Sequence, residues 1–453
     1  MAGCDTRLAN IIILGVAFML IFTAFQTCSM AQKAVLASVN NGTFEGNGYT
    51  SLGIIYAVFS VSTWAAPSVV AFAGPKISMF LGSAMYFLFI LSFLKPMVWT
   101  LYTGSALVGV GAAVLWTGQG NFLTINSDSE TIGRNTGIFF ALSQCSLLFG
   151  NLYIFLVFHG EATIADSART YLFTGLSGAS LLGSLFLLFL RKKRIEDTDN
   201  LVSLNASATQ SPDTPVAAFK RSFQLLKTQE MLILSVVFAY TGIAVTFFSG
   251  VYGTCLAQNE HFNVGSLPTG ISRKGLLGIS GMLIGAGEIV GGGLLGLLGR
   301  RMNKYGRDPV VIMGYIVHMT AFYLAFVNLP MDSPVNESHT PTYFHSSWEV
   351  ALVCSFLLGF GDICVNSQLV SLLGVVFAED SSPAFALRSF VQSVAAAAGF
   401  YYSNVLLLKW QLLILVIMGT GSVPCFCIVE WMTTRASRSG YQRPGPELAL
   451  ARQ

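Results

Sequence analysis

The chain has 453 residues, of which 53% are hydrophobic and only 10% are charged, against roughly 25% charged residues in soluble domains. A chain so poor in charge cannot surround a core of this size with a water-facing surface, which excludes a soluble globular protein. The net charge of +3 gives no indication of a nucleic-acid partner, so the expected surrounding is the lipid bilayer.

Twelve stretches are apolar enough to cross a bilayer, which takes about 20 residues in helical form. Lipid offers the backbone no hydrogen bonds, so a span is a helix or part of a closed barrel, and these runs lack the alternation of barrel strands. The fold class is therefore an all-α membrane protein with twelve transmembrane helices. The predicted spans are 8–30, 51–72, 77–94, 99–124, 136–158, 169–190, 230–252, 275–298, 309–329, 349–376, 385–407 and 411–432.

The spans fall into two groups of six around a polar stretch. Four regions are predicted: an N-terminal six-helix bundle over 1–190, a cytosolic linker over 191–229, a C-terminal six-helix bundle over 230–433 and a cytosolic tail over 434–453. Residues 216–229 of the linker alternate apolar and basic side chains, which is typical of an amphipathic helix on the membrane surface or of an extended seventh span. The first apolar run exceeds the length of a signal peptide, so an uncleaved span is favoured over that alternative.

Positive charge sets the expected orientation. With both termini in the cytosol, only six Lys and Arg residues face outside, leaving 19 of the 25 on the cytosolic side, in agreement with the positive-inside rule. The sequons at Asn41 and Asn336 then lie in outside loops, where they are expected to carry N-glycans. The sequon at Asn205 lies in the linker and is expected to stay bare. No sorting signal selects a particular membrane.

A local sequence detail repeats in the two halves. The fourth span contains Gly-Gln-Gly-Asn at 118–121, and the tenth contains Gly-Phe-Gly-Asp at 359–362. Each is followed by a short turn and then by a span with a glutamine, Gln144 or Gln392. Halves repeated in parallel, with a binding site between them near the midplane, are a ground plan of secondary transporters. Two pseudo-symmetric six-helix bundles around a shared centre are therefore predicted.

The eighth predicted span is unusually rich in glycine, with ten between 275 and 299. Small residues at spacings of three and four make a smooth helix face. This pattern favours tight packing against a neighbouring helix, with bending during function as the alternative.

Ionisable residues inside spans are the first candidates for function, because charge is expensive in lipid. Glu288 lies in the middle of the eighth span, and Asp362 lies in the tenth, one turn before Asn366. Either carboxylate is expected to bind a proton or a cation in a central cavity. The alternative is a structural ion pair, such as Arg388 with Asp362 or Glu379.

Uncharged side chains add to the expected cavity. Gln119 and Trp116 are three residues apart and share a helix face, and Asn121 and Gln26 are further candidate lining residues. The alternative for each is hydrogen bonding between helices.

Charged residues after the fourth span suggest a cytosolic gate. Asp128 and Arg134 lie in this turn, where Lys76 or Arg221 is the expected partner. A solvated turn is the alternative reading.

Together these features resemble the major facilitator superfamily. Its basic, glycine-rich signature appears in degraded form at 296–309, and its first copy, at 74–76, lacks the Asp-Arg pair. The resemblance implies a carrier that works by alternating access, with Arg307, Asp308 and Arg388 as gating candidates.

The run at 109–124 resembles more closely the Unc-93-like branch of this superfamily, and the runs at 10–18 and 247–255 support the similarity. Members of that branch are associated with potassium-channel regulation and with escorting Toll-like receptors. The resemblance therefore implies either a secondary transporter of an unidentified solute or ion, or a non-transporting adaptor for a channel or receptor.

Enzyme motifs are missing from the sequence. It has no glycine-rich loop followed by Lys-Ser/Thr, no His-Glu-x-x-His and no nucleophile elbow. The expectation is a protein that is not an enzyme and needs no cofactor or metal.

Glycan mapping tests the predicted topology. In a glycosylating host, we expect Asn336→Gln and Asn41→Gln each to increase gel mobility by one glycan, because both sequons lie outside. Asn205→Gln, the matched control, should leave mobility unchanged. Sugar on Asn205 would indicate the opposite orientation. Sugar on neither Asn41 nor Asn336 would leave the predicted orientation without support.

Overall fold

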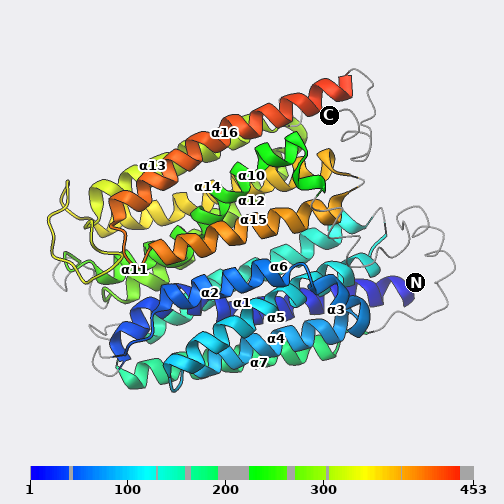
Figure 1. Cartoon of the computed structure of the whole chain (residues 1–453). Coiled ribbons are helices and arrows are strands. Elements are labelled where there is room, and N and C mark those ends of the chain that lie inside the picture. Colours follow the sequence, from blue (N-terminus) through cyan, green and yellow to red (C-terminus); the bar gives the residue numbers. More distant parts are fainter. Residues whose placement is uncertain are drawn as a thin grey trace.

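Long helices account for most of the structure, a computed structural model that describes residues 2–39, 44–128, 131–158, 165–191, 224–262, 271–302, 306–378 and 380–438. Figure 1 shows them running side by side, with both chain ends at one end of the molecule. We call that end the terminal side and the opposite end the distal side. Most of the linker, including 216–223, and the tail from 439 onward lie outside the described residues.

The N-terminal half is built from seven helical segments. They are α1 (Ala2–Ser38), α2 (Gly48–Ser62), α3 (Ala66–Ala73), α4 (Pro75–Ser92), α5 (Val98–Ile125), α6 (Ile132–Val157) and α7 (Asp166–Leu188). Between α2 and α3 the chain bends by 69°, and Pro67 sits in the first turn of α3, where a missing backbone N–H is tolerated. The bent pair occupies the place of the second predicted span.

The C-terminal half follows the same plan. Its elements are α10 (Gln229–Thr246), the π-helical turn η3 (Phe247–Val251), α11 (Tyr252–Gln258), α12 (Gly275–Met302), α13 (Asp308–Asn328), α14 (Trp348–Val376), α15 (Ser381–Tyr402) and α16 (Leu408–Arg438). The segments α10, η3 and α11 form one continuous span. Helix α16 continues past residue 433, the predicted end of the bundle.

Ten spans in the described part of the chain are long and apolar enough to cross a membrane, and the bent pair α2–α3 makes eleven. A helix occupies every predicted span, but α15 falls short of the hydropathy of the others. Arg388 and Gln392 are among the residues that interrupt its apolar sequence. The all-α membrane fold is confirmed, whereas the count of twelve spans is not.

Helix pairing shows that the two halves are built alike. In the first half α1 packs on α6 and α7, and in the second α10 packs on α15 and α16. Likewise α5 packs on α2 and α4, as α14 packs on α12 and α13. The halves meet along the pairs α6–α12 and α2–α15, between the blue-to-cyan helices and the green-to-red helices of Figure 1. The predicted pseudo-symmetric arrangement is confirmed.

A threonine packed on a glycine repeats at equivalent places. Gly150 of α6 lies against the Thr27 hydroxyl of α1, and Gly399 of α15 lies against the Thr246 hydroxyl of α10. A Cβ at either glycine would overlap the threonine. The first and fifth helices of each half therefore approach closely because one residue has no side chain.

The glycines of α12 allow close packing on two sides. Gly281 faces the Asn151 side chain of α6, in the other half, and Gly287 faces the Phe356 carbonyl of α14. Gly278 and Gly285 also face α6. The prediction of a tightly packed face is confirmed, and one of its two neighbours belongs to the opposite bundle.

The outer surface is apolar, as a surface in lipid should be. Phe72 is 94% exposed, and many other large apolar side chains of the helices are open to the surroundings. Trp99 and Trp410 are exposed at distal helix starts and Trp431 near the terminal end of α16. Tryptophan is enriched at these two levels of membrane proteins.

Two glycines of α12 make a matched stability test. We expect Gly287→Ala to destabilise the protein by roughly 1–3 kcal/mol, as overpacking does, because the new Cβ would strike the Phe356 carbonyl. Gly293→Ala meets no atom within 4 Å and should leave stability unchanged. The measurement is thermal unfolding in detergent, and equal melting temperatures would contradict the described α12–α14 contact.

Candidate functional site

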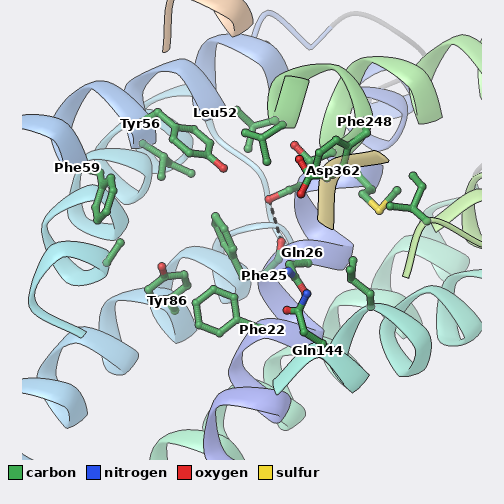
Figure 2. Close-up of a pocket in the computed structure, with 18 of the residues that line it drawn as sticks. Phe22, Phe25, Gln26, Leu52, Tyr56, Phe59, Tyr86, Gln144, Phe248 and Asp362 are labelled. Carbon is green, nitrogen blue, oxygen red and sulfur yellow. Dashed lines mark hydrogen bonds between the residues drawn. The ribbon is translucent and has the colours of Figure 1, made fainter. Parts of the chain in front are cut away.

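A cavity of about 290 Å³ lies where the two halves meet. Five helices of the N-terminal half reach it, namely α1, α2, α4, α5 and α6, together with α10, η3, α12 and α14 of the other half. Figure 2 shows Phe22, Phe25 and Tyr86 along one wall, with Asp362 and Phe248 across from them. The cavity therefore belongs to neither bundle alone.

Glu288 is the most enclosed charged residue of the cavity, with 8% of its surface exposed. The Gln144 side chain of α6 donates a hydrogen bond of 2.7 Å from Nε2 to Glu288 Oε2. Within the described part of the chain, no donor reaches the second oxygen, Oε1. The bond connects the two halves, and the second oxygen is available to a proton, a cation or a hydrogen-bond donor in the cavity.

Asp362 lies at the end of a polar chain in the second half. Asn366 Nδ2 donates to Asp362 Oδ1 at 3.0 Å, and Arg388 Nη2 donates to Asn366 Oδ1 at 2.8 Å. Arg388 thus acts on Asp362 through Asn366 rather than by a direct ion pair. The other alternative partner of Arg388, Glu379, lies outside the described residues.

Aromatic rings form the wall contributed by the N-terminal half. The Trp116 ring lies 5.1 Å from the Phe22 ring, and the Phe25 ring lies 4.9 Å from the Tyr86 ring, centroid to centroid. Gln26 also lines the cavity and accepts a hydrogen bond of 2.6 Å from Ser146. Gln26 and Trp116 therefore both border the cavity, and their role in binding stays a prediction.

Two lining candidates lie elsewhere on α5. Gln119 is buried but outside the cavity lining, and Asn121 is exposed on the helix surface. An α-helix turns by about 100° per residue, so Asn121 lies on nearly the opposite side from Trp116. Helix α5 thus borders the cavity through Ala112 and Trp116, whereas Gln119 and Asn121 are directed elsewhere.

Sequence reasoning missed much of the aromatic wall and the residues of η3. Tyr56, Tyr86 and Phe248 line the cavity but look like ordinary core aromatics in the sequence. Phe248 and Ser249 come from η3, and single π-helical turns often mark functional sites. No sequence signal identifies such a turn.

The gating candidates of the first half pair within that half. Asp128 forms an ion pair of 2.6 Å with Arg7, and Arg134 hydrogen-bonds Asn135. Lys76 donates to the Leu188 carbonyl at 2.7 Å, and Arg221 lies outside the described residues. Asp128 therefore pairs with Arg7 rather than with Lys76 among the described residues.

The candidates of the second half are also internal to it. Arg307 of α13 pairs with Glu430 of α16 at 2.9 Å and reaches Ser371 of α14. Asp308 Oδ1 is buried with no hydrogen bond among the described residues. These groups tie the terminal ends of three helices together, and none of the bonds described for them crosses to the other half.

Several contacts between the halves lie on the distal side. Helix α1 packs on η3 and α11, Asn404 reaches Thr50 at 3.4 Å, and Ser272 donates to the Phe158 carbonyl at 2.7 Å. Toward the terminal side, the Trp64 ring lies 5.5 Å from the Phe390 ring of α15, centroid to centroid, so the halves also touch there.

A buried histidine of α13 connects three helices of the second half through hydrogen bonds to α10 and α14. His318 is 1% exposed, and its Nε2 lies 3.1 Å from the Leu358 carbonyl. Because a carbonyl only accepts, Nε2 carries the proton, and Nδ1 accepts from the Tyr240 hydroxyl at 2.6 Å. His318 therefore has a structural role.

A second charged cluster covers the distal end of the C-terminal half. Lys274 lies 3.0 Å from Glu337, and Arg273 lies 3.2 Å from Glu337 and 3.5 Å from Glu260. Burial lowers the pKa of Lys274, although Glu337 opposes the shift. Burial alone would raise the pKa of Glu337, but Lys274 and Arg273 hold it below its usual value.

In the part of the chain that the structure describes, no group of three or more His, Cys, Asp or Glu side chains is placed to hold a metal ion.

Solved structures with the same arrangement are membrane transporters. A peptide transporter, POT, in complex with sulfate matches 95% of this chain and 95% of its own, with a TM-score of 0.67 and 11% identity. The nucleoside transporter NupG matches with a TM-score of 0.64 and 11% identity, covering 93% of this chain and 99% of its own. Together with the paired bundles, these matches define a multi-pass membrane protein of the major facilitator fold.

The family is narrower than the fold. Residues 40–427 match the family described as "Ion channel regulatory protein UNC-93", and the chain belongs to this family. It is 48% identical over 443 residues to the UNC93-like protein MFSD11 of Xenopus tropicalis, covering 95% of this chain and 98% of that one. UNC93-like protein 3 of Arabidopsis thaliana is 25% identical, covering 93% and 85%. The resemblance to the Unc-93-like branch is confirmed.

The distal charged cluster predicts a pH dependence. The folded-state pKa of Glu337 lies below the unfolded value of about 4.3, so its ion pairs stabilise the protein above that pH and are lost as pH falls through the folded pKa. Glu337→Gln should reduce the free energy of unfolding at neutral pH by under about 1 kcal/mol for this half-exposed group, and so lower the melting temperature, with a smaller effect in acid. Glu45→Gln, an exposed carboxylate, is the control. A Glu337→Gln effect that is independent of pH would contradict these ion pairs.

Proposed function

We propose that the protein is a secondary transporter that carries a small solute through the central cavity by alternating access. One observation carries the proposal. The cavity lies between the two halves and contains Glu288, whose carboxylate is bonded to the opposite half through Gln144. A solute bound in the cavity would contact both bundles. Its binding free energy would therefore depend on their relative position, and its binding would shift that position.

The carboxylates supply a reason for coupling. A charge taken out of water is costly unless a partner compensates for it, and each of the two has one oxygen with no donor among the described residues. A bound proton or cation would supply that compensation. Closing the bundles around the site is then easier when it is occupied, which is what coupled transport requires.

Glu288 and Asp362 have different parts in this proposal. Asp362 is already balanced in part by Arg388 through Asn366, whereas the one bond to Glu288 comes from an uncharged amide. We assign the main coupling role to Glu288. Asp362 and Asn366 have a supporting role, because they set the electrostatic potential inside the cavity. Gln26 and Trp116 line the path of the solute.

The packing supports motion of one half against the other. The glycines of α12 present a smooth face to α6 across the interface, and η3 places a π-helical turn beside the cavity. Alternating access then requires the distal contacts between the halves to separate in one state and the terminal contact of Trp64 with Phe390 to separate in the other. With both termini in the cytosol, as the Lys and Arg distribution indicates, the terminal side is the cytosolic side.

A second function has one specific observation in its favour, the description of the matching family as channel-regulatory. In this alternative the protein is an adaptor that binds a membrane channel or receptor. Crosslinking in native membranes should then recover one dominant membrane partner. Recovery of none would count against the adaptor.

Uptake assays test the transporter. An untargeted metabolite comparison of knockout and parent cells would supply candidate solutes, and uptake would then be measured in proteoliposomes. We expect Glu288→Gln to reduce uptake at least tenfold, and Asp362→Asn to reduce it less, because each removes a charge from the cavity. The amount of folded protein, measured by size-exclusion chromatography, should be unchanged.

Glu45→Gln makes the same chemical change at an exposed site outside the cavity and serves as the control. Full uptake by Glu288→Gln would contradict the proposed coupling. Loss of folded protein in proportion to loss of uptake would instead assign Glu288 a structural role.

A further inference from the structure

The cavity has an unusual chemical composition. Seven of the twenty residues that line it are aromatic, two are carboxylic acids, and none is Lys, Arg or His. From this composition we infer that the solute is an organic cation with a flat, apolar body of one or two rings. The inference rests on the proposed transport function, and it adds the chemical class of the substrate.

The aromatic wall suits a cation held against apolar surface. A cation within about 6 Å of a ring centroid is attracted to the face of the ring, most strongly for tryptophan. Trp116, Tyr86 and Phe25 all border the cavity, and neighbouring rings meet at steep angles, 56° for Trp116 on Phe22 and 86° for Phe25 on Tyr86. Such an arrangement presents both faces and edges to an occupant.

The charge of the site favours a cation over other solutes. Glu288 is more than nine-tenths buried and lines the cavity, and its Oε1 accepts no hydrogen bond from the described residues. Arg388 is separated from the cavity by Asn366 and is not part of its lining. An anion would be repelled by Glu288, whose one described bond comes from an uncharged amide, and a neutral solute would leave this carboxylate without a charged partner, which is costly away from water.

Size and lining argue against a bare metal ion as the cargo. Hard cations are held by six or more oxygen atoms at short distances, whereas this cavity is mostly aromatic and aliphatic. Its volume of about 290 Å³ is at the small end for organic ligands. The apolar wall comes mainly from the N-terminal half and both carboxylates come from the C-terminal half, so a cation with a ring system would contact both.

Three probes of similar shape test the inference on the purified full-length protein. They are N-methyl-4-phenylpyridinium, a flat cation; 4-phenylpyridine, neutral at pH 8; and biphenyl-4-carboxylate, an anion. Equilibrium binding should be at least tenfold tighter for the cation than for the other two. Equal binding of all three, or no binding of the cation, would overturn the inference.

Variants locate the binding site. Glu288→Gln should weaken cation binding about tenfold, which is about 1.4 kcal/mol, and leave the neutral probe unaffected. Trp116→Leu should weaken it as well, whereas Glu45→Gln and Trp99→Leu, both at exposed positions, should not. Unchanged cation binding in a folded Glu288→Gln protein would contradict the site. If that variant does not fold, Asp362→Asn and the comparison of the three probes on the parent protein decide.

The two proposals fail in different ways. Cation binding without uptake in proteoliposomes would overturn the transporter and leave the cation site intact. Uptake of an anionic or neutral solute, with no cation binding, would overturn the cation inference and leave the transporter intact.

Discussion

Lipid provides no hydrogen bonds, and this single constraint shapes the whole molecule. It forces the backbone of each span into a helix, it leaves the outer surface apolar, and it makes every polar side chain in the interior expensive unless a partner satisfies it. Many interior polar groups are satisfied: His318 bonds Tyr240 and a carbonyl, and buried hydroxyls such as that of Ser184 bond their own helices. Other buried hydroxyls, such as those of Thr27 and Tyr49, have no hydrogen-bond partner among the described residues. Glu288 and Asp362 differ from these because they line the cavity, and each has one carboxylate oxygen without a donor in the described part of the chain.

The two halves share a plan of helix pairing but differ in what they bring to the centre. Rings come mainly from α1, α2, α4 and α5, and acid groups come from α12 and α14. Among the described residues, the hydrogen bond from Gln144 to Glu288 is the one polar link between the halves that joins two residues lining the cavity. The repeat therefore supplies a symmetric frame, and function would come from the differences between the copies.

The sequence predicts the fold well because hydropathy, glycine spacing and charge asymmetry are properties of local segments. It also singles out Glu288, Asp362, Gln26 and Trp116, which line the cavity, since a charge, an amide or an indole ring inside a span is conspicuous, while their role stays a prediction. It does not separate Asn121 from Trp116, which lie on opposite faces of one helix. Nor does it predict that Arg7 pairs with Asp128, because such a pairing depends on how distant helices meet. The aromatic wall is missed for the same reason.

Helix α15 has a consequence for how the chain is held in the bilayer. Its sequence contains Arg388 and Gln392, and an arginine within a span opposes insertion, at a cost that reaches about 2.5–3.5 kcal/mol at the helix centre and is smaller toward the ends. In the folded protein α15 packs on α10 and, across the interface, on α2. Its stable place in the bilayer thus depends on helices synthesised much earlier, one of them in the opposite bundle. The second half is therefore held in the bilayer in part by its contact with the first, and the two bundles are not independent parts.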